Sequence, residues 1–294
     1  MLKILFCCLA TLAVSLGQRR QSQLYFSAYV LYTKDNPKSG LKVLATPASV
    51  IPLPINKWTN CAIIVHGYHG KGSNDMNMVL RDAFLTGGKT NVIVVDWAVA
   101  ASNPQIAPDA VPAIGENIAE LVKHLVMFGK ISKAKLHLVG FDLGAHVVGC
   151  AGRLIRDVAR ITGLNPVGGE QWMLSRSHLR STDAKYVEAI HTEVSEIGLP
   201  VAVGEVDFFP NGGVRQPGCQ NIECSHNRAW QLFAASLTNG PIMGYRCSSV
   251  DEALNLQGPC TGYALPLGNN DLVKLGSGVY SLSTSAVYPY SISG

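Results

Sequence analysis

One short segment limits what this chain can fold into more than any other. Residues 136–139 form an apolar run typical of a buried strand, the sequence Gly140-Phe141-Asp142-Leu143-Gly144 follows, and residues 145–155 carry a helical pattern. The two glycines allow the chain to turn sharply and the helix to pack close to the strand. The segment therefore predicts a strand, a tight turn and a helix, with Asp142 at the apex of the turn.

This arrangement is typical of a nucleophile elbow, the turn that holds a reactive side chain above the sheet of an α/β-hydrolase. In serine hydrolases the middle residue of the elbow is the Ser that attacks the ester. In this chain the middle residue is Asp142. The sequence thus predicts the scaffold of an esterase without the hydroxyl group that would attack.

The rest of the chain fits the same fold class. Short apolar runs predict strands and helical spacing predicts helices; we expect strands at 62–65, 92–95, 160–162, 186–190 and 279–282, and helices at 113–128 and 228–237. Repeated alternation of strand and helix is typical of an α/β protein with a doubly wound, mostly parallel sheet. With 294 residues, 47% of them apolar, the chain is long enough for one large domain of the α/β-hydrolase fold.

The first 17 residues have the pattern of a signal peptide. Lys3 gives a positive start, residues 4–14 are apolar, and small residues follow at 15–17. We therefore expect a secreted, extracellular protein whose single domain covers residues 18–294, with no transmembrane anchor in the mature chain. The net charge of +4 is mild and no run of basic residues is present, which argues against a nucleic-acid partner.

Six of the eight cysteines follow the signal peptide. An even number in a secreted chain favours disulfides, and we expect Cys219 to pair with Cys224 and Cys247 with Cys260, because both segments have the composition of loops. Cys61 and Cys150 are expected to be buried thiols, although the sequence also allows a disulfide between them. No spacing of Cys and His is typical of zinc, so the sequence predicts no metal and no cofactor.

Beyond the elbow, the chain resembles the neutral lipases of the pancreatic lipase type, and most closely their short insect relatives, including the secreted phospholipase A1 enzymes. The resemblance covers nearly all of the mature chain, in blocks that keep the family's order. These blocks are 26–37 (FSAYVLYTKDNP), 63–68 (IIVHGY), 91–97 (NVIVVDW), 136–153 (LHLVGFDLGAHVVGCAGR), 161–166 (ITGLNP), 187–192 (VEAIHT), 206–219 (VDFFPNGGVRQPGC) and 224–229 (CSHNRA). The resemblance implies a catalytic domain without the C-terminal β-sandwich domain of pancreatic lipases.

The resemblance also implies where the family's catalytic residues fall. The nucleophile position falls on Asp142, the acid position on Asn165, and the base position on His226. The oxyanion donors fall on the backbone amides of Tyr68 and Leu143. Two of the three triad positions therefore depart from the family pattern, and the lid between the paired cysteines is shortened to residues 220–223, which would leave the cleft open.

These substitutions change the chemistry of the site. A carboxylate that attacks an acyl group forms an anhydride, which collapses back because the carboxylate is the better leaving group. Asp142 would also place a negative charge beside a pocket built for an oxyanion. Asn165 cannot stabilise a charged His226 and can select the wrong tautomer. Asp142 and His226 are instead able to form a static ion pair.

Three functional hypotheses follow from this pattern. The first is a lipase-like protein without catalysis that binds a lipid or acyl chain, binds a protein partner, or serves in storage as insect yolk proteins of this fold do. The second is a hydrolase in which Asp142 is alkylated by an epoxide or halide, although the sequence offers no residue to activate either substrate. The third is residual lipase or phospholipase activity on carboxylic esters.

Several other polar residues have structural interpretations. We expect His146 to be a packed residue of the elbow helix, His66 to hold the oxyanion loop in shape, and Asp96 to be structural. Glu193 follows a predicted strand, where some α/β-hydrolases place the triad acid. It is therefore an alternative to Asn165 as the partner of His226.

Overall fold

The computed structural model describes residues 25–87, 89–255 and 260–291, so the predicted signal peptide lies outside the described residues. Within these residues, eleven strands form one sheet in the order β10-β9-β11-β8-β7-β6-β5-β3-β4-β1-β2. The strands are β1 (Ala28–Tyr32), β2 (Leu41–Val43), β3 (Asn60–Val65), β4 (Thr90–Asp96), β5 (Leu136–Phe141), β6 (Arg160–Leu164), β7 (Val187–Ile190), β8 (Val206–Pro210), β9 (Ile242–Arg246), β10 (Ala264–Leu267) and β11 (Gly278–Leu282).

The centre of the sheet is parallel and its edges are antiparallel. Strands β4, β3, β5, β6, β7, β8 and β11 pair in parallel, whereas β1 and β2 on one side and β9 and β10 on the other pair antiparallel. Parallel neighbours need crossover connections, and helices supply most of them. The expected doubly wound, mostly parallel sheet of the α/β-hydrolase fold is confirmed.

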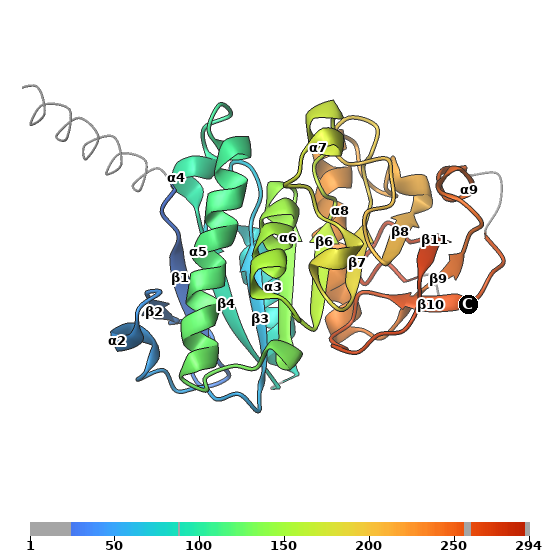
Figure 1. Cartoon of the computed structure of the whole chain (residues 1–294). Coiled ribbons are helices and arrows are strands. Elements are labelled where there is room, and N and C mark those ends of the chain that lie inside the picture. The colour runs from blue at the N-terminus through green and yellow to red at the C-terminus, as the bar shows by residue number, and fades with distance from the viewer. Residues whose placement is uncertain (1–24, 88, 256–259, 292–294) are drawn as a thin grey trace, which may run out of the picture.

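Helices cover both faces of the sheet (Figure 1). The helices are α2 (Pro47–Val50), α3 (Asp75–Thr86), α4 (Ala98–Ala101), α5 (Ala107–Met127), α6 (Leu143–Ile155), α7 (Glu170–Leu174), α8 (Ile222–Thr238) and α9 (Val250–Leu254). Alternate residues of β3 separate two cores: Ile63 and Val65 pack with α5 and α6, and Ala62 and Ile64 pack with α3 and α8. Both faces of the strands are buried, which explains their continuous apolar runs.

The predicted elements are found, with longer helices than expected. Helix α5 begins at Ala107 instead of 113, because Pro108 lies in its first turn, where the missing N–H group costs nothing. Helix α8 begins at Ile222 instead of 228, because the Asn221 side chain caps it by accepting from the Cys224 amide at 2.8 Å.

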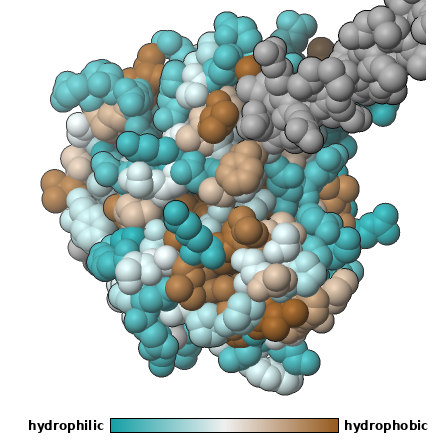
Figure 2. All heavy atoms as spheres, turned by 90° about the vertical axis from the view of Figure 1, so that its left-hand side faces the viewer, coloured by the Kyte–Doolittle hydropathy of each residue, from teal (hydrophilic) through white to brown (hydrophobic). Residues whose placement is uncertain are grey.

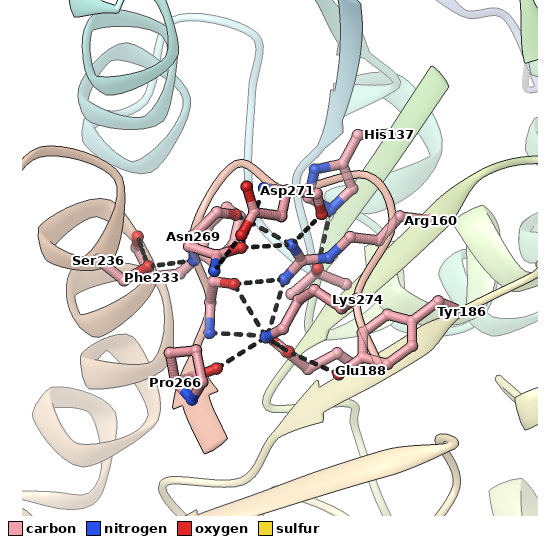
Figure 3. A network of polar contacts seen from close by, with 12 residues as sticks. His137, Arg160, Tyr186, Glu188, Phe233, Ser236, Pro266, Asn269, Asp271 and Lys274 are labelled. Atoms are coloured by element: carbon pink, nitrogen blue, oxygen red, sulfur yellow. Dashed lines mark hydrogen bonds and ion pairs between the residues drawn. The ribbon is translucent and has the colours of Figure 1, made fainter. Parts of the chain in front are cut away.

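A buried group of charges fastens the C-terminal region to the central strands (Figure 3). Glu188 of β7 is fully buried and lies 3.0 Å from Arg160 of β6 and 2.5 Å from Lys274. Arg160 also donates to the Gly268 carbonyl at 2.7 Å. Because every partner is itself buried, this network holds the loop between β10 and β11 in place, away from the elbow.

The edge at β1 and β2 carries several exposed apolar side chains, and Figure 2 shows such groups among hydrophilic ones on this side of the molecule. Leu41, Leu44 and Ile51 are among them. Over the described part of the chain, no helix has both the length and the apolar character needed to span a bilayer.

Candidate functional site

The candidate site lies at the carboxyl ends of the parallel strands. Tyr68 follows β3, Asp142 follows β5, Asn165 follows β6, and Glu193 follows β7, while His226 lies in the first turns of α8. Parallel strands end at one edge of the sheet, and ligand sites of open α/β sheets lie there. Figure 1 shows α4 and α7 at this same end.

The elbow has the backbone that the sequence predicts. Asp142 has φ 56° and ψ −121°, a conformation that side-chain-bearing residues rarely adopt. A Cβ atom on Gly140 would lie 2.1 Å from the Gly144 carbonyl oxygen, and one on Gly144 would lie 2.4 Å from the Val65 carbonyl oxygen. Both glycines are therefore required by the close approach of α6 to β5 and β3.

The carboxylate of Asp142 contacts the oxyanion loop. Its Oδ2 accepts a hydrogen bond from the Tyr68 amide at 2.7 Å. Gly67 makes this approach possible, because a Cβ atom there would lie 2.5 Å from Oδ2. The amide that the resemblance assigns to an oxyanion thus already has an anionic partner, while Leu143 follows Asp142 and lines the same cleft.

Asn165 is completely buried, and its hydrogen bonds determine which way its amide points. Its Oδ1 accepts from the backbone amides of Thr192 at 2.7 Å and Glu193 at 2.8 Å. Its Nδ2 donates to the Glu193 carbonyl at 2.9 Å. Reversing the amide would place NH₂ against two N–H donors, so Nδ2 is the atom that faces His226.

The contact between Asn165 and His226 determines the tautomer of the imidazole. Nδ2 of Asn165 lies 2.6 Å from Nδ1 of His226. Because Nδ2 can only donate, Nδ1 must accept, and the ring proton of neutral His226 resides on Nε2. Nε2 faces Asp142 Oδ1 across 3.7 Å, so the atom that serves as the base in a hydrolase carries a proton here.

Burial also determines the charge of His226. Desolvation lowers the pKa of the ring below its ordinary value, although the Asp142 carboxylate opposes this shift. Burial therefore favours the neutral ring. The static ion pair considered from the sequence needs a charged imidazole; the two groups lie 3.7 Å apart, and burial of the ring opposes the charge that such a pair requires.

The carboxylate of Glu193 points to a different neighbour. Its Oε1 accepts from the amide of Ser195 at 3.0 Å and from the Ser195 hydroxyl, and its Oε2 accepts from the amide of Ile197 at 2.9 Å. The carboxylate is therefore hydrogen-bonded to the turn that follows β7, and none of these bonds involves His226. The backbone of Glu193, and not its side chain, contacts Asn165.

The other polar residues singled out in the sequence lie in packed surroundings. His146 is buried, stacks on Trp172, accepts from the Leu179 amide at Nδ1 and contacts the Val167 carbonyl through Nε2. His66 Nε2 accepts from the Trp97 amide at 3.2 Å and lies 3.6 Å from Asp96. These contacts support the structural roles expected for His66, His146 and Asp96.

A cleft of about 600 Å³ opens above Asp142 and His226. The size is within the range of small-molecule sites. Its walls include apolar residues that the sequence analysis did not assign to the site: Pro104, Pro108, Phe141, Val167, Trp172 and Ile197. Most of them lie in segments that follow strands. This position after a strand is the only feature of the sequence that could have indicated that they line the cleft.

Both expected disulfides form. Cys219 bonds to Cys224 and Cys247 bonds to Cys260, while Cys61 and Cys150 are buried free thiols. The first disulfide encloses the short segment 220–223, and Glu223, in the first turn of α8, lies at the cleft. In the described residues we find no cluster of three His, Cys, Asp or Glu side chains arranged to hold a metal ion.

Comparison with known proteins gives the family. The family model described as Lipase matches residues 10–264. Phospholipase A1 member A of Rattus norvegicus is 33% identical over 235 residues, covering 75% of this chain and 51% of that protein. Pancreatic lipase-related protein 2 of Cavia porcellus is 34% identical over 239 residues, covering 76% of this chain and 54% of that protein.

The chain thus spans about half the length of these curated relatives. Among solved structures it is similar to an alpha/beta hydrolase enzyme from a Medee basin deep-sea metagenome library, at 14% identity and a TM-score of 0.34 over 52% of this chain and 61% of that one. A TM-score this low adds no evidence for the fold beyond the order of strands in the sheet and the family match. On the family model and the identity to these relatives, the chain belongs to the lipase family of the pancreatic lipase type.

Proposed function

We propose that this protein is a secreted member of the lipase family that binds an apolar ligand in its cleft without hydrolysing it. The observation that carries the proposal is the hydrogen bond from Asn165 Nδ2 to His226 Nδ1 at 2.6 Å. It leaves a proton on Nε2, so His226 cannot accept one from a nucleophile or a water at that atom. Asp142 has no hydroxyl to activate.

The oxyanion loop supports the same conclusion. The Tyr68 amide donates to Asp142 Oδ2 and is not free for a tetrahedral intermediate. A developing oxyanion at this place would lie beside a carboxylate, which opposes its charge. The same tautomer disfavours the alternative in which Asp142 is alkylated, because His226 would have to take a proton from the water that releases the product.

The cleft and the family support binding of a lipid-like ligand. The cleft is lined largely by apolar side chains, and the names of the relatives refer to lipase and phospholipase activity. The two disulfides are typical of an oxidising compartment, which supports secretion. A protein partner, a storage role and membership of the insect branch remain predictions from the sequence.

The test compares three proteins on triacylglycerol and phospholipid: the wild type, Asp142→Ala and His226→Ala. We expect fatty acid release at the level of the buffer blank for all three. Release by the wild type that either substitution abolishes would overturn the proposal.

Native mass spectrometry of the secreted protein, followed by lipid extraction, tests whether the protein binds an apolar ligand. A bound apolar molecule, on a chain that begins at residue 18, is the expected result. Failure to bind any apolar probe would contradict the ligand role.

A further inference from the structure

The floor of the cleft holds two polar atoms that face each other without bonding. Oδ1 of Asp142 and Nε2 of His226 are 3.7 Å apart, which is too far for a hydrogen bond. The side chains are 8% and 9% exposed, so both are more than nine-tenths buried. Among the described residues, Oδ1 accepts no hydrogen bond, whereas Oδ2 accepts from Tyr68.

The hydrogen-bonding role of each atom is fixed by its neighbours. Oδ1 belongs to a carboxylate and accepts. Nε2 of His226 carries the ring proton and donates, because Nδ1 accepts from Asn165. The floor of the cleft therefore offers one acceptor and one donor to whatever lies above them.

The charge of the cleft excludes one class of ligand. Asp142 and Glu223 line it, and no Lys or Arg belongs to the described lining. A carboxylate or phosphate group at the floor would lie beside the Asp142 carboxylate in a partly desolvated place, where like charges repel strongly. A fatty acid is therefore disfavoured with its head group at this position.

The remaining head groups differ in which roles they supply. An ester has only acceptors, so it would satisfy His226 and oppose Asp142. A protonated amine is attracted by the carboxylates of Asp142 and Glu223, but it has only donors, so it would satisfy Asp142 and leave Nε2–H facing a second donor. A hydroxyl group is both donor and acceptor at one oxygen and satisfies both atoms.

We propose that the cleft is a binding site for an alcohol with an apolar body. The hydroxyl donates to Asp142 Oδ1 and accepts from His226 Nε2–H, while the body contacts Leu143, Trp172 and Ile197. The assignment rests on the proposed function and narrows its ligand class. It also gives Asp142 a role in ligand binding, whereas the proposed absence of catalysis by itself gives this residue no role.

The experiment ranks four probes of equal chain length on the wild-type protein at pH 7.5: 1-octanol, octanoate, methyl octanoate and octylamine. Isothermal titration calorimetry measures each dissociation constant. We expect octanol to bind about tenfold tighter than each of the others, which is the worth of roughly one buried hydrogen bond. Equal binding of octanol and any other probe would overturn the inference, and this ranking needs no variant.

Asp142→Asn gives a sharper second test. The Tyr68 amide holds the amide oxygen as it holds Oδ2 now, so NH₂ would face the cleft beside Nε2–H. Two donors then favour acceptors, and we expect octanoate and methyl octanoate to overtake octanol. Asp251→Asn, which neutralises an exposed carboxylate on α9 outside the cleft, should keep the wild-type order.

The outcomes separate the two proposals. Methanol released from methyl octanoate by the wild type would overturn the proposed function. Binding of several probes without preference for octanol, or an unchanged order in Asp142→Asn, would overturn only the alcohol assignment. Absence of binding for all four would contradict the apolar-ligand role itself.

Discussion

Asn165 holds the candidate site together through four hydrogen bonds, and one of them sets the tautomer of His226. Its amide satisfies two backbone donors, one backbone acceptor and the imidazole of His226. The resemblance assigns this position to the triad acid, which would accept from Nδ1 of the imidazole, whereas Asn165 donates to it. The reversed bond moves the proton of His226 to Nε2, and Asp142 then meets a donor in place of a base.

Part of this could be predicted from the sequence. Asp142, Asn165 and His226 lie in short local motifs, so their identities and the missing hydroxyl are visible in the chain. The direction of the Asn165 amide is not, because it depends on the Thr192 amide, 27 residues away. The bond from the Tyr68 amide to Asp142 joins residues 74 apart, and no local pattern indicates it.

Asn165→Asp should raise the pKa of His226. The introduced carboxylate accepts a hydrogen bond from Nδ1–H and favours the charged ring, whereas the Asn165 amide nitrogen can only donate to Nδ1. The change also removes the donor to the Glu193 carbonyl, so we expect a loss of about 1 to 3 kcal/mol in the free energy of unfolding. An NMR titration of the His226 ring measures the shift, with Asp251→Asn as a charge-removing control; an unchanged pKa would show that Asn165 does not determine the tautomer.

Restoring catalysis should need both triad positions. Asp142→Ser supplies a hydroxyl and frees the Tyr68 amide, but Nε2 stays protonated, so we expect only slight esterase activity. Adding Asn165→Asp should raise kcat by about 10³ to 10⁴-fold, the size of the triad-acid effect in a serine protease. Hydrolysis of a short-chain ester measures both variants, and high activity of Asp142→Ser alone would show that another group orients His226.

At the scale of elements, the buried parallel strands were predictable and the edge strands were not. Strands β3, β4 and β5 are buried on both faces, which gives the short, nearly continuous apolar runs rich in Val and Ile that are typical of buried parallel strands. Strand β1 alternates buried and half-buried residues, β9 alternates less regularly with exposed ones, and β10 at the edge is mostly half-buried. Their pairing depends on distant partners, so composition alone could not reveal them.

The two disulfides should stabilise the fold to different extents. In the chain-entropy model, the Cys219–Cys224 bond, with a separation of 5, contributes about 2 kcal/mol, and the Cys247–Cys260 bond, with a separation of 13, about 3 kcal/mol. Urea unfolding of the paired Cys→Ala variants measures both losses. A larger loss from the shorter loop would mean that the Cys219–Cys224 bond acts on the folded state, through the start of α8 and His226.

For the whole molecule, the buried histidines make stability depend on pH. His146 accepts from the Leu179 amide at Nδ1, and burial lowers its pKa to about 4. Burial also lowers the pKa values of His137 and His226. As the pH falls below about 6.5, these residues take up protons in the unfolded chain before they do so in the folded protein. Each of them therefore favours unfolding as the solution becomes acidic.

The fall expected from His146 alone between pH 7.5 and 4 is about 3 kcal/mol in the free energy of unfolding, from the difference between its unfolded pKa and about 4. Asp183 acts in the opposite direction, because burial raises its pKa to about 6. The measurement therefore compares urea unfolding of the wild type and His146→Gln at both pH values, so that Asp183 contributes equally to each. The variant should be less stable at pH 7.5, yet its stability should fall by about 3 kcal/mol less on acidification. Parallel losses in the two proteins would mean that His146 is protonated in the fold and that its bond from Leu179 does not hold the ring neutral.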